Sequence, residues 1–555
     1  MIRTLAEVPT TQPLAADICI IGAGAAGLAL ASEFANTHYR VVVLESGTAS
    51  RSGDSDELNE TIVAGVPHSG STEGRARTLG GATTLWGGQV LPLRESETRS
   101  RPWVPHSGWP FGPATLEPYY RRVEPLLGTP GPPYGDEAWG LLGVPAPALD
   151  RDRYLYRFSQ WAPLTRRNMA LALRTELKSS RNVDVLLGAT VVNVVPARDG
   201  GHVAHVDIVA AGGKPRQVRA RAYVVCCGGI ETPRLLLASG GRRGIANRSG
   251  LVGRFFQDHI SCIAGVISEQ SRSAVRRYFE PRYRGGAMYT CKIEPTDRAL
   301  TEHGLLNVMA HVKFEIPEAL GLLELKRMLN DVQRGRLPIP SLRSAIAMTR
   351  GAAEFARLAF ARAALSRRAA PTRGRLLLMV DVEQAPNPDS RIRLADETDR
   401  LGMPKAVVDW RLSGLETRTI TQFTAMLARD WERAGLGTVE VVREVDFAAC
   451  DVLGAARDIY HHMGATRLSE SPRDGVVDVN LRSHEVDNLY VASGSVFPTG
   501  GIANPTFTIL ALALRLADRL KVVLARDNES ASAHSFAATT DVERRERRKT
   551  SSRPP

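Results

Sequence analysis

The chain has 555 residues, 43% of them hydrophobic and 23% charged, with a formal net charge of +12 at pH 7. This length exceeds the roughly 250–300 residues at which a single core stops growing, so we expect two or more domains. The ordinary composition excludes a fibrous or wholly disordered protein.

Neither a membrane span nor a nucleic-acid partner is expected. No apolar stretch reaches the roughly 18 residues that cross a bilayer, and no signal-peptide pattern follows Met1, so we expect a cytoplasmic protein. The excess basic residues lie mainly between residues 315 and 375 and in 544–549, and no nucleic-acid motif accompanies either cluster.

The cysteines predict no metal or haem site. None has a zinc spacing or a haem-attachment pattern, and most stand inside apolar runs, which is typical of small buried hydrophobic residues in a reducing compartment. They are Cys19, Cys226, Cys227, Cys262, Cys291 and Cys450.

At the N-terminal end the pattern predicts a strand, a glycine turn, a helix and a second strand. The apolar run 17–21 leads into Gly22, small residues then continue at helical spacing to Phe34, and the β-branched run 39–44 closes on Glu45. This order is a βαβ unit.

The turn carries the motif G-x-G-x-x-G, formed by Gly22-Ala23-Gly24-Ala25-Ala26-Gly27. Its first glycine permits a tight turn, its second lets backbone approach a pyrophosphate, and its third allows close helix-to-strand packing. The helix amino terminus attracts phosphate, and Glu45 stands where an acidic residue accepts hydrogen bonds from a ribose. The motif predicts a dinucleotide site but does not distinguish FAD from NAD.

A glycine-rich segment, 65–88, follows and contains Gly80-Gly81 and Gly87-Gly88, which is typical of backbone wrapped around a ligand. Further along, periodicity predicts helices at 115–127, 231–239 and 416–434, and strands at 183–195, 203–208, 217–225, 264–268, 287–293, 305–314, 376–382, 391–394 and 406–409. The strands after about residue 262 suggest the large sheet of a second domain.

Between residues 316 and 373 an arginine-rich segment has Arg343, Arg350 and Arg357 at seven-residue spacing, which predicts amphipathic helices. We interpret it as a solvated insertion covering the substrate domain, with membrane-surface docking or an oligomer contact as alternatives. Beyond about Arg526 the tail lacks apolar spacing and is expected to be disordered.

The C-terminal part carries the most specific pattern. It contains Tyr460-His461-His462-Met463-Gly464-Ala465-Thr466-Arg467, then the segment 488–498 with Gly494-Ser495, and finally Ile502-Ala503-Asn504-Pro505-Thr506 opening an apolar helix. Together with Leu79-Gly80-Gly81, Trp86-Gly87-Gly88, Ser107-Gly108-Trp109-Pro110 and Val252-Gly253-Arg254, these ordered motifs resemble the glucose–methanol–choline (GMC) oxidoreductases, especially their sugar-oxidising branch.

The resemblance implies an FAD-dependent oxidoreductase that oxidises an alcohol, on a sugar or sugar-like polyol, by hydride transfer to flavin N5. His461 would be the catalytic base and Asn504 would orient the hydroxyl oxygen. The segment Thr83-Thr84-Leu85-Trp86 lacks the histidine that bonds to flavin in some relatives, so we expect noncovalent FAD. The expected cofactor contacts are Gly22, Gly24, Ala25, Ala26, Gly27, Glu45, Ser46, Arg77, Gly80, Gly81, Trp86, Gly87, Gly88, Val191, Gly228, Gly494, Ser495, Asn504, Pro505 and Thr506.

From the residues alone, His461 also fits a core histidine and Asn504-Pro505 also fits a helix start. A flavin hydroxylase using NAD(P)H, or a noncatalytic flavin-binding protein, are the alternative functions. The electron acceptor, whether dioxygen, a quinone or another compound, and the oligomeric state cannot be inferred.

The expected fold is α/β, with a Rossmann-like FAD-binding domain and a second α+β substrate domain built on a large, mainly antiparallel sheet. The expected segments are 1–100, 176–262 and 450–525 for the FAD domain, 101–175 as an FAD-covering connection, 263–449 for the substrate domain with a helical insertion at about 315–373, and 526–555 as a tail.

Overall fold

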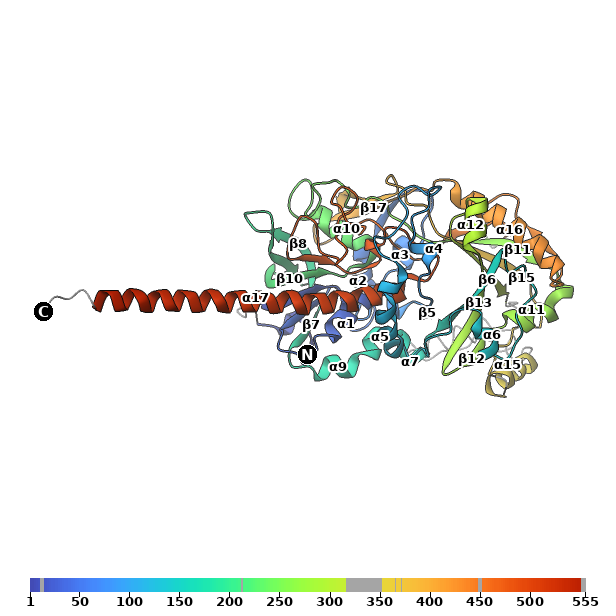
Figure 1. Cartoon of the computed structure of the whole chain (residues 1–555), viewed down its shortest axis with the longest axis horizontal. Coiled ribbons are helices and arrows are strands. Elements are labelled where there is room, and N and C mark those ends of the chain that lie inside the picture. The colour runs from blue at the N-terminus through green and yellow to red at the C-terminus, as the bar shows by residue number, and fades with distance from the viewer. Residues whose placement is uncertain are drawn as a thin grey trace.

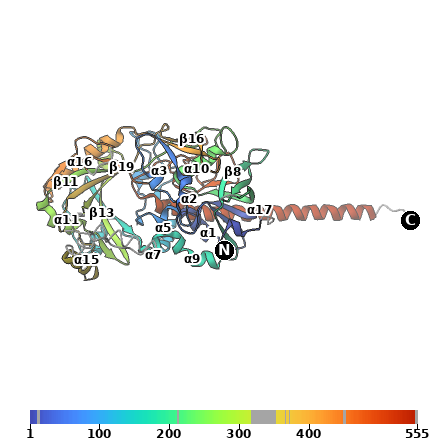
Figure 2. The same cartoon turned by 180° about the vertical axis from the view of Figure 1, so that it is seen from behind.

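The structure is a computed structural model and describes residues 1–9, 14–210, 213–315, 352–364, 366–370, 372–447 and 452–550, with side chains to residue 529. Two sheet-based parts lie side by side, and a long C-terminal helix extends from the first (Figure 1). The view from behind shows the same arrangement (Figure 2). The expected two-domain α/β fold is confirmed.

The first domain is built on a sheet of eight described strands in the order β1-β7-β3-β2-β10-β9-β8, with β20 beside β10. Its parallel part consists of β1 (Ile2–Thr4), β2 (Leu14–Ile21), β3 (Val41–Glu45), β7 (Val183–Leu187), β10 (Arg216–Val225) and β20 (Leu489–Val491). Residues from the start, middle and end of the chain therefore share one sheet.

One predicted strand of this domain is divided in the structure. Residues 183–195 were expected to form a single strand, but they form β7 and, after a break, β8 (Thr190–Pro196). The break falls at Gly188, whose φ of +66° turns the chain out of the parallel sheet. Strand β8 then pairs antiparallel with β9 (Val203–Val209), which pairs with β10.

The second domain is built on a sheet of nine described strands, all antiparallel, in the order β18-β11-β15-β14-β13-β6-β5, with β12 and β19 as side branches. They are β5 (Gln89–Val90), β6 (Tyr154–Trp161), β11 (Ile260–Ile267), β12 (Arg282–Arg284), β13 (Ala287–Pro295), β14 (Val308–Phe314), β15 (Leu376–Val382), β18 (Val439–Val441) and β19 (Ala456–Asp458). One face packs its alternate apolar side chains against α16 (Leu415–Arg433).

Two parts of this domain differ from expectation. Strand β6 lies within residues 101–175, which were expected only to connect and cover, yet it pairs along its length with β13. The strands expected at 391–394 and 406–409 form β16 (Arg391–Thr398) and β17 (Pro404–Trp410), which pair with β4 (Thr61–Gly65) in a separate three-stranded sheet. Local periodicity predicts where strands lie but not which strands pair with one another.

Helix α1 (Ala25–Ser32) follows the glycine turn and is buried from Ala26 to Ser32. Its small side chains let it lie between the first sheet and α17 (Pro505–Thr550). Four of the cysteines, Cys19, Cys226, Cys262 and Cys291, are buried and free as expected, while Cys450 lies outside the described residues.

The predicted insertion lies mostly outside the described residues, which resume at α15 (Ala352–Ala364). The tail beyond Arg526 differs from the expectation of disorder, because α17 continues through it to Thr550 and projects beyond the body (Figure 1). Alanine, glutamate and arginine are strong helix formers and are frequent in this stretch.

Candidate active site

The glycine turn between β2 and α1 has the geometry that the motif predicts. Gly22 has a φ of +103°, and a Cβ on Gly27 would lie 1.9 Å from the carbonyl oxygen of Gly22. Gly24 differs, because a Cβ there would meet nothing within 4 Å. The first and third glycines are therefore required by the protein itself, whereas the second faces open space where a ligand can approach.

Glu45 ends β3 beside this turn. Its two carboxylate oxygens accept hydrogen bonds from the Ala23 amide at 2.9 Å and the Gly47 amide at 2.8 Å. Burial raises the pKa of Glu45, and these two hydrogen bonds oppose that rise. The carboxylate is thus held at the mouth of the glycine turn, with further lone pairs for ligand hydroxyls.

A cavity of about 690 Å³ runs from the glycine turn to His461 and Asn504. It is lined by the predicted cofactor residues, with the exception of Gly27, Gly80, Gly88 and Ser495. These four lie behind the wall: a Cβ on Gly80 would approach Asn168 Oδ1 at 2.6 Å, and Ser495 Oγ bonds Thr466 Oγ1 at 2.6 Å. Their contact with the cofactor stays a prediction.

The wall near Glu45 contains a charged cluster around Glu231, on α10 (Gly228–Ala238), that the sequence did not indicate. Arg75, Arg77 and Arg234 all pair with the Glu231 carboxylate. Arg77, one of the predicted cofactor residues, also donates a hydrogen bond to Ser46 Oγ at 3.2 Å, so its guanidinium contacts both Glu231 and Ser46. Burial alone would raise the pKa of Glu231, but the surrounding guanidinium groups lower it to about 2.

At the other end of the cavity, the two predicted catalytic residues meet. Asn504 immediately precedes α17, and its Nδ2 lies 3.4 Å from His461 Nε2. On the other side of the ring, His461 Nδ1 lies 2.9 Å from His259 Nδ1, and the His461 backbone amide donates to Asp258 Oδ1 at 2.8 Å. Burial lowers the pKa of His461 well below its ordinary value, and His259 lowers it further.

A chain of amide hydrogen bonds fixes which nitrogen of His461 carries the proton. Gln89 Nε2 donates to Asn504 Oδ1 at 2.8 Å and to Ser159 Oγ at 3.0 Å. The Asn504 amino group is therefore the part that faces His461 Nε2, which must act as acceptor. Because the ring is neutral, its single proton is on Nδ1 and is donated to His259 Nδ1.

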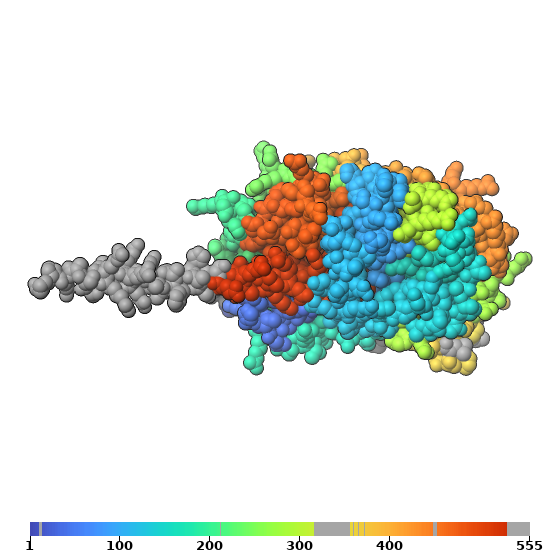
Figure 3. Space-filling view, in the orientation of Figure 1, coloured from blue at the N-terminus to red at the C-terminus, as the bar shows by residue number. Residues whose placement is uncertain are grey.

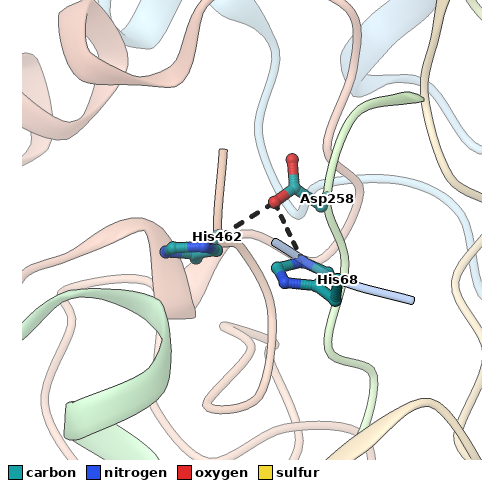
Figure 4. Close-up of side chains that lie close together, drawn as sticks. All are labelled: His68, Asp258 and His462. Atoms are coloured by element: carbon teal, nitrogen blue, oxygen red, sulfur yellow. Dashed lines mark ion pairs between the residues drawn. The ribbon is translucent and has the colours of Figure 1, made fainter. Parts of the chain in front are cut away.

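His462 points away from this pair. Its Nε2 lies 3.8 Å from Asp258 Oδ2, and His68 Nε2 lies 3.2 Å from the same oxygen, as Figure 4 shows. The three ligand atoms lie within 4.8 Å of one another, so this buried group has donors of a type that hold metal ions. Asp258 also accepts from the His461 backbone amide through its other oxygen, Oδ1. The sequence prediction of no metal stays a prediction.

The loop that carries His461 and His462 is held between two glycines. A Cβ on Gly229 would lie 2.5 Å from the His462 carbonyl oxygen, and one on Gly494 would lie 2.6 Å from it. On the visible face of the molecule, segments from both ends of the sequence adjoin, where blue and orange-red regions lie side by side (Figure 3).

Several residues around the site were not predicted, namely Gln89, His259, Asp258, His68 and the cluster at Glu231. The sequence gives an incomplete indication for two of them, because Asp258 and His259 directly precede the apolar run that forms the buried strand β11. The others contact the site only through the tertiary fold, which pairs residues far apart in the sequence.

The glycine turn, Glu45 and the cavity define a dinucleotide-binding fold with a second domain built on an antiparallel sheet. Models of one family match both parts: the C-terminal model "GMC oxidoreductase" covers residues 386–513 and the N-terminal model covers 165–261. The chain is therefore similar to the GMC oxidoreductases in both of these segments. The members of this family bind FAD, and the glycine turn, Glu45 and the cavity fit that cofactor.

Similar proteins span the chain almost completely. Paromamine 6'-oxidase of Streptomyces fradiae is 25% identical, over 90% of this chain and 90% of that protein. The large subunit of fructose dehydrogenase from Gluconobacter japonicus is 22% identical, over 92% and 98%. Aspergillus oryzae formate oxidase, solved in a study of FAD modification, superposes with a TM-score of 0.53 at 17% identity, covering 92% of this chain and 99% of the other.

Among the described residues, no helix is both long enough and apolar enough to cross a membrane.

Proposed function

We propose that the protein oxidises the CH–OH group of a sugar or sugar-like polyol to a carbonyl, with His461 as the base and Asn504 as the residue that orients the hydroxyl. The proposal is carried by the 3.4 Å contact between Asn504 Nδ2 and His461 Nε2 at the cavity wall. A hydroxyl oxygen between them would accept from the amide and donate its proton to the imidazole.

The protonation state of His461 supports this role. The lowered pKa keeps the imidazole neutral near pH 7, so it is free to accept a proton. Its acceptor nitrogen faces Asn504, and its donor nitrogen is held by His259. FAD, when bound noncovalently in the cavity, supplies the two-electron acceptor for the hydride that leaves the carbinol carbon.

The names of relatives favour a polyhydroxylated substrate over a simple alcohol. They include an oxidase of paromamine and a dehydrogenase of fructose, together with a 2-methyl-1,2-propanediol dehydrogenase that is 24% identical over 92% of this chain. These relatives divide between oxidases and dehydrogenases, so the proposal leaves the final electron acceptor open.

The test is anaerobic bleaching of the bound flavin across a panel of sugars and alcohols. His461→Ala should retain FAD but reduce it about 10²- to 10⁴-fold more slowly, the range typical of base assistance. Unchanged reduction kinetics would reject His461 as the base. NAD(P)H consumption without an alcohol would point instead to a hydroxylase, and a flavin that no compound bleaches would point to a noncatalytic protein.

A further inference from the structure

One edge of the molecule carries basic side chains from segments far apart in the sequence. Helices α7 (Leu164–Arg167), α9 (Arg174–Ser179) and α15 lie along the lower edge in Figure 1, and the view from behind places them on the same edge (Figure 2). Helix α8 (Met169–Ala172) connects α7 to α9 and contacts both. We call this surface the basic edge, after its exposed basic residues, which are Arg166, Arg174, Lys178, Arg284, Arg362 and Arg368.

Strand register shows that the two ends of the basic edge belong to one surface. Trp161 ends β6 three residues before α7 begins, and it pairs with Met288 on β13. Met288 pairs in turn with Tyr283 on β12, and the Arg362 guanidinium of α15 lies over the Tyr283 ring, 3.7 Å from its centroid. Because neighbouring strands are about 4.8 Å apart, only about 10 Å of sheet separates the start of α7 from the residue that α15 covers.

Strand β12 brings arginines of like charge together on this edge. The Arg368 amide donates to the Pro281 carbonyl at 2.9 Å, and Arg367 stands opposite Arg282 in a short antiparallel bridge. Burial lowers the pKa of Arg282, and the charge of Arg367 lowers it further. Burial also lowers the pKa of Arg167, and the charge of Arg368 acts in the same direction. These guanidinium groups therefore repel one another.

Among the residues that the structure describes, no acidic side chain neutralises this charge. None of the residues of the basic edge makes an ion pair with a carboxylate within 4.0 Å. Glu280, which lies next to β12, is held by Arg276 at 2.6 Å and by the Ala370 amide at 2.8 Å. Residues 164–181 contain one acidic residue, Glu176, beside Arg166, Arg167, Arg174, Lys178 and Arg181. A surface with this unbalanced positive charge attracts an anionic partner.

A large apolar side chain stands next to the basic residues at each end of the edge. Leu164 is 61% exposed and Phe360 is 62% exposed, more than any other large hydrophobic residue that the structure describes. Leu164 precedes Arg166 by two positions on α7, and Phe360 precedes Arg362 by two positions on α15. Leu171, on α8, is 56% exposed. Exposed apolar side chains among basic ones are typical of surfaces that lie in a membrane interface.

The combination favours an anionic membrane over other anionic partners. Basic side chains near a membrane are attracted to its negatively charged lipids, and apolar side chains beside them enter the boundary between headgroups and acyl chains. A phosphate backbone or a free phosphate would bind the arginines but would leave the two leucines exposed. A symmetric contact with a second copy would bring two basic edges together, and their like charges would repel.

From this arrangement we infer that the basic edge docks the protein on the surface of an anionic membrane, with the arginines at the lipid phosphates and Leu164, Leu171 and Phe360 among the headgroups. The inference is independent of the proposed function. It has a consequence for the cavity, because Trp161 lines the cavity and the Arg167 guanidinium lies 6.0 Å from the centroid of its ring. The docked membrane would therefore lie beside one wall of the cavity.

The test is co-sedimentation of the full-length, flavin-loaded protein with lipid vesicles. One set contains phosphatidylcholine alone, and the other contains phosphatidylcholine with about one-third phosphatidylglycerol. At about 0.1 M salt the protein should sediment with the anionic vesicles and not with the neutral ones, and about 0.5 M salt should weaken binding because it screens the charges.

Two double variants separate the charged from the apolar contribution. Arg166→Gln with Arg362→Gln should lower the partition coefficient for anionic vesicles about tenfold or more, because two attractive charges are lost. Leu164→Ser with Phe360→Ser should lower it about fivefold or more, because less apolar surface leaves water.

Matched control variants change equally exposed residues on the opposite side of the molecule. Arg242→Gln with Arg243→Gln removes the same charge just after α10, which lies in the upper part of the molecule in Figures 1 and 2. Val63→Ser removes an exposed apolar side chain on β4, which pairs with β17. Both controls should bind as the parent does, and flavin content and melting temperature identify any folding defect.

Four results would overturn the inference. The first is no sedimentation with anionic vesicles, and the second is an equal loss of binding in the edge variants and the controls, which would indicate attraction by net charge alone. The third is unchanged binding in Leu164→Ser with Phe360→Ser together with equally tight binding to heparin, which would indicate a soluble polyanion. The fourth is a dimer in analytical ultracentrifugation that the edge variants abolish, which would make a second copy of the chain the partner.

Discussion

His259 and His461 face each other through their Nδ1 atoms, 2.9 Å apart, so one ring must donate and the other must accept. The contact between Asn504 and His461 Nε2 makes His461 the donor. If His461 is the base, as proposed, His259 is a positioning residue that selects the tautomer with Nε2 free to accept a proton.

Replacing His259 by alanine should slow flavin reduction about 10- to 100-fold, because the wrong tautomer of His461 becomes populated; base catalysis as a whole is worth 10²- to 10⁴-fold. His259→Asn, whose Oδ1 can accept the same proton, should recover part of the rate. Recovery in His259→Asn is the result that a merely structural defect would not give, and equal rates in His259→Ala and His259→Asn would contradict the positioning role.

Gly24 and Gly27 form a matched pair for the cofactor site. Gly24→Val should weaken FAD retention without lowering the melting temperature of the apoprotein, because its Cβ meets only open space. Gly27→Val should destabilise the fold itself, since its Cβ would lie 1.9 Å from Gly22 O. Flavin absorbance per protein and calorimetry of the apoprotein check the two outcomes, and equal FAD retention in Gly24→Val would contradict the predicted phosphate approach.

Glu45→Ala should also weaken retention of the cofactor, because its carboxylate both orders the glycine turn and faces the cavity. Full FAD occupancy of the purified variant after dialysis would count against a ribose contact.

Glu231→Gln should lower the free energy of unfolding by about 3–5 kcal/mol, because it leaves buried guanidinium groups without their counter-charge. The pKa of Glu231 falls from 4.5 to about 2 on folding, so its contribution is fully present above pH 4.5 and is lost as pH falls toward 2. Denaturant unfolding at several pH values should therefore show a shallower acid dependence in the variant. Glu397→Gln, at an exposed site on β16, is the control.

The group formed by His68, Asp258 and His462 gives a test of metal content. We expect the purified protein to contain no stoichiometric transition metal by mass spectrometry, and dialysis against EDTA to leave flavin reduction and melting temperature unchanged. One equivalent of bound zinc or iron, lost together with activity on chelation, would show that these residues are ligands.

Much of the site could be predicted because many of its residues stand in short sequence motifs. The turn from Gly22 to Gly27 and the approach of His461 to Asn504 follow from local sequence and from the family pattern. The close packing of Gly80 against Asn168 and of Gly88 against Arg167 could not be predicted, since a glycine required for packing and one required by a ligand look alike in sequence. Gln89, His259 and Glu231 reach the site only through strand pairing and helix docking, which local periodicity does not encode.

The sheets show the same limit at a larger scale. Strand β15 matches its predicted bounds, 376–382, because its apolar run is continuous. The pairing of β6 with β13 joins residues more than 120 positions apart, as in the 129-residue separation of Trp161 from Thr290. Which strands pair over such a distance depends on how their faces fit together in the folded protein.

The place of β20 and the start of α17 in the sequence has a consequence for biosynthesis. Both come after residue 488, yet one adds to the first sheet beside β10 and the other supplies Asn504. The cofactor chamber therefore stays incomplete until the segment up to residue 505 has left the ribosome. FAD is therefore expected to bind late in synthesis. A chain that ended before β20 would have the glycine turn but would lack the residues that complete the cavity.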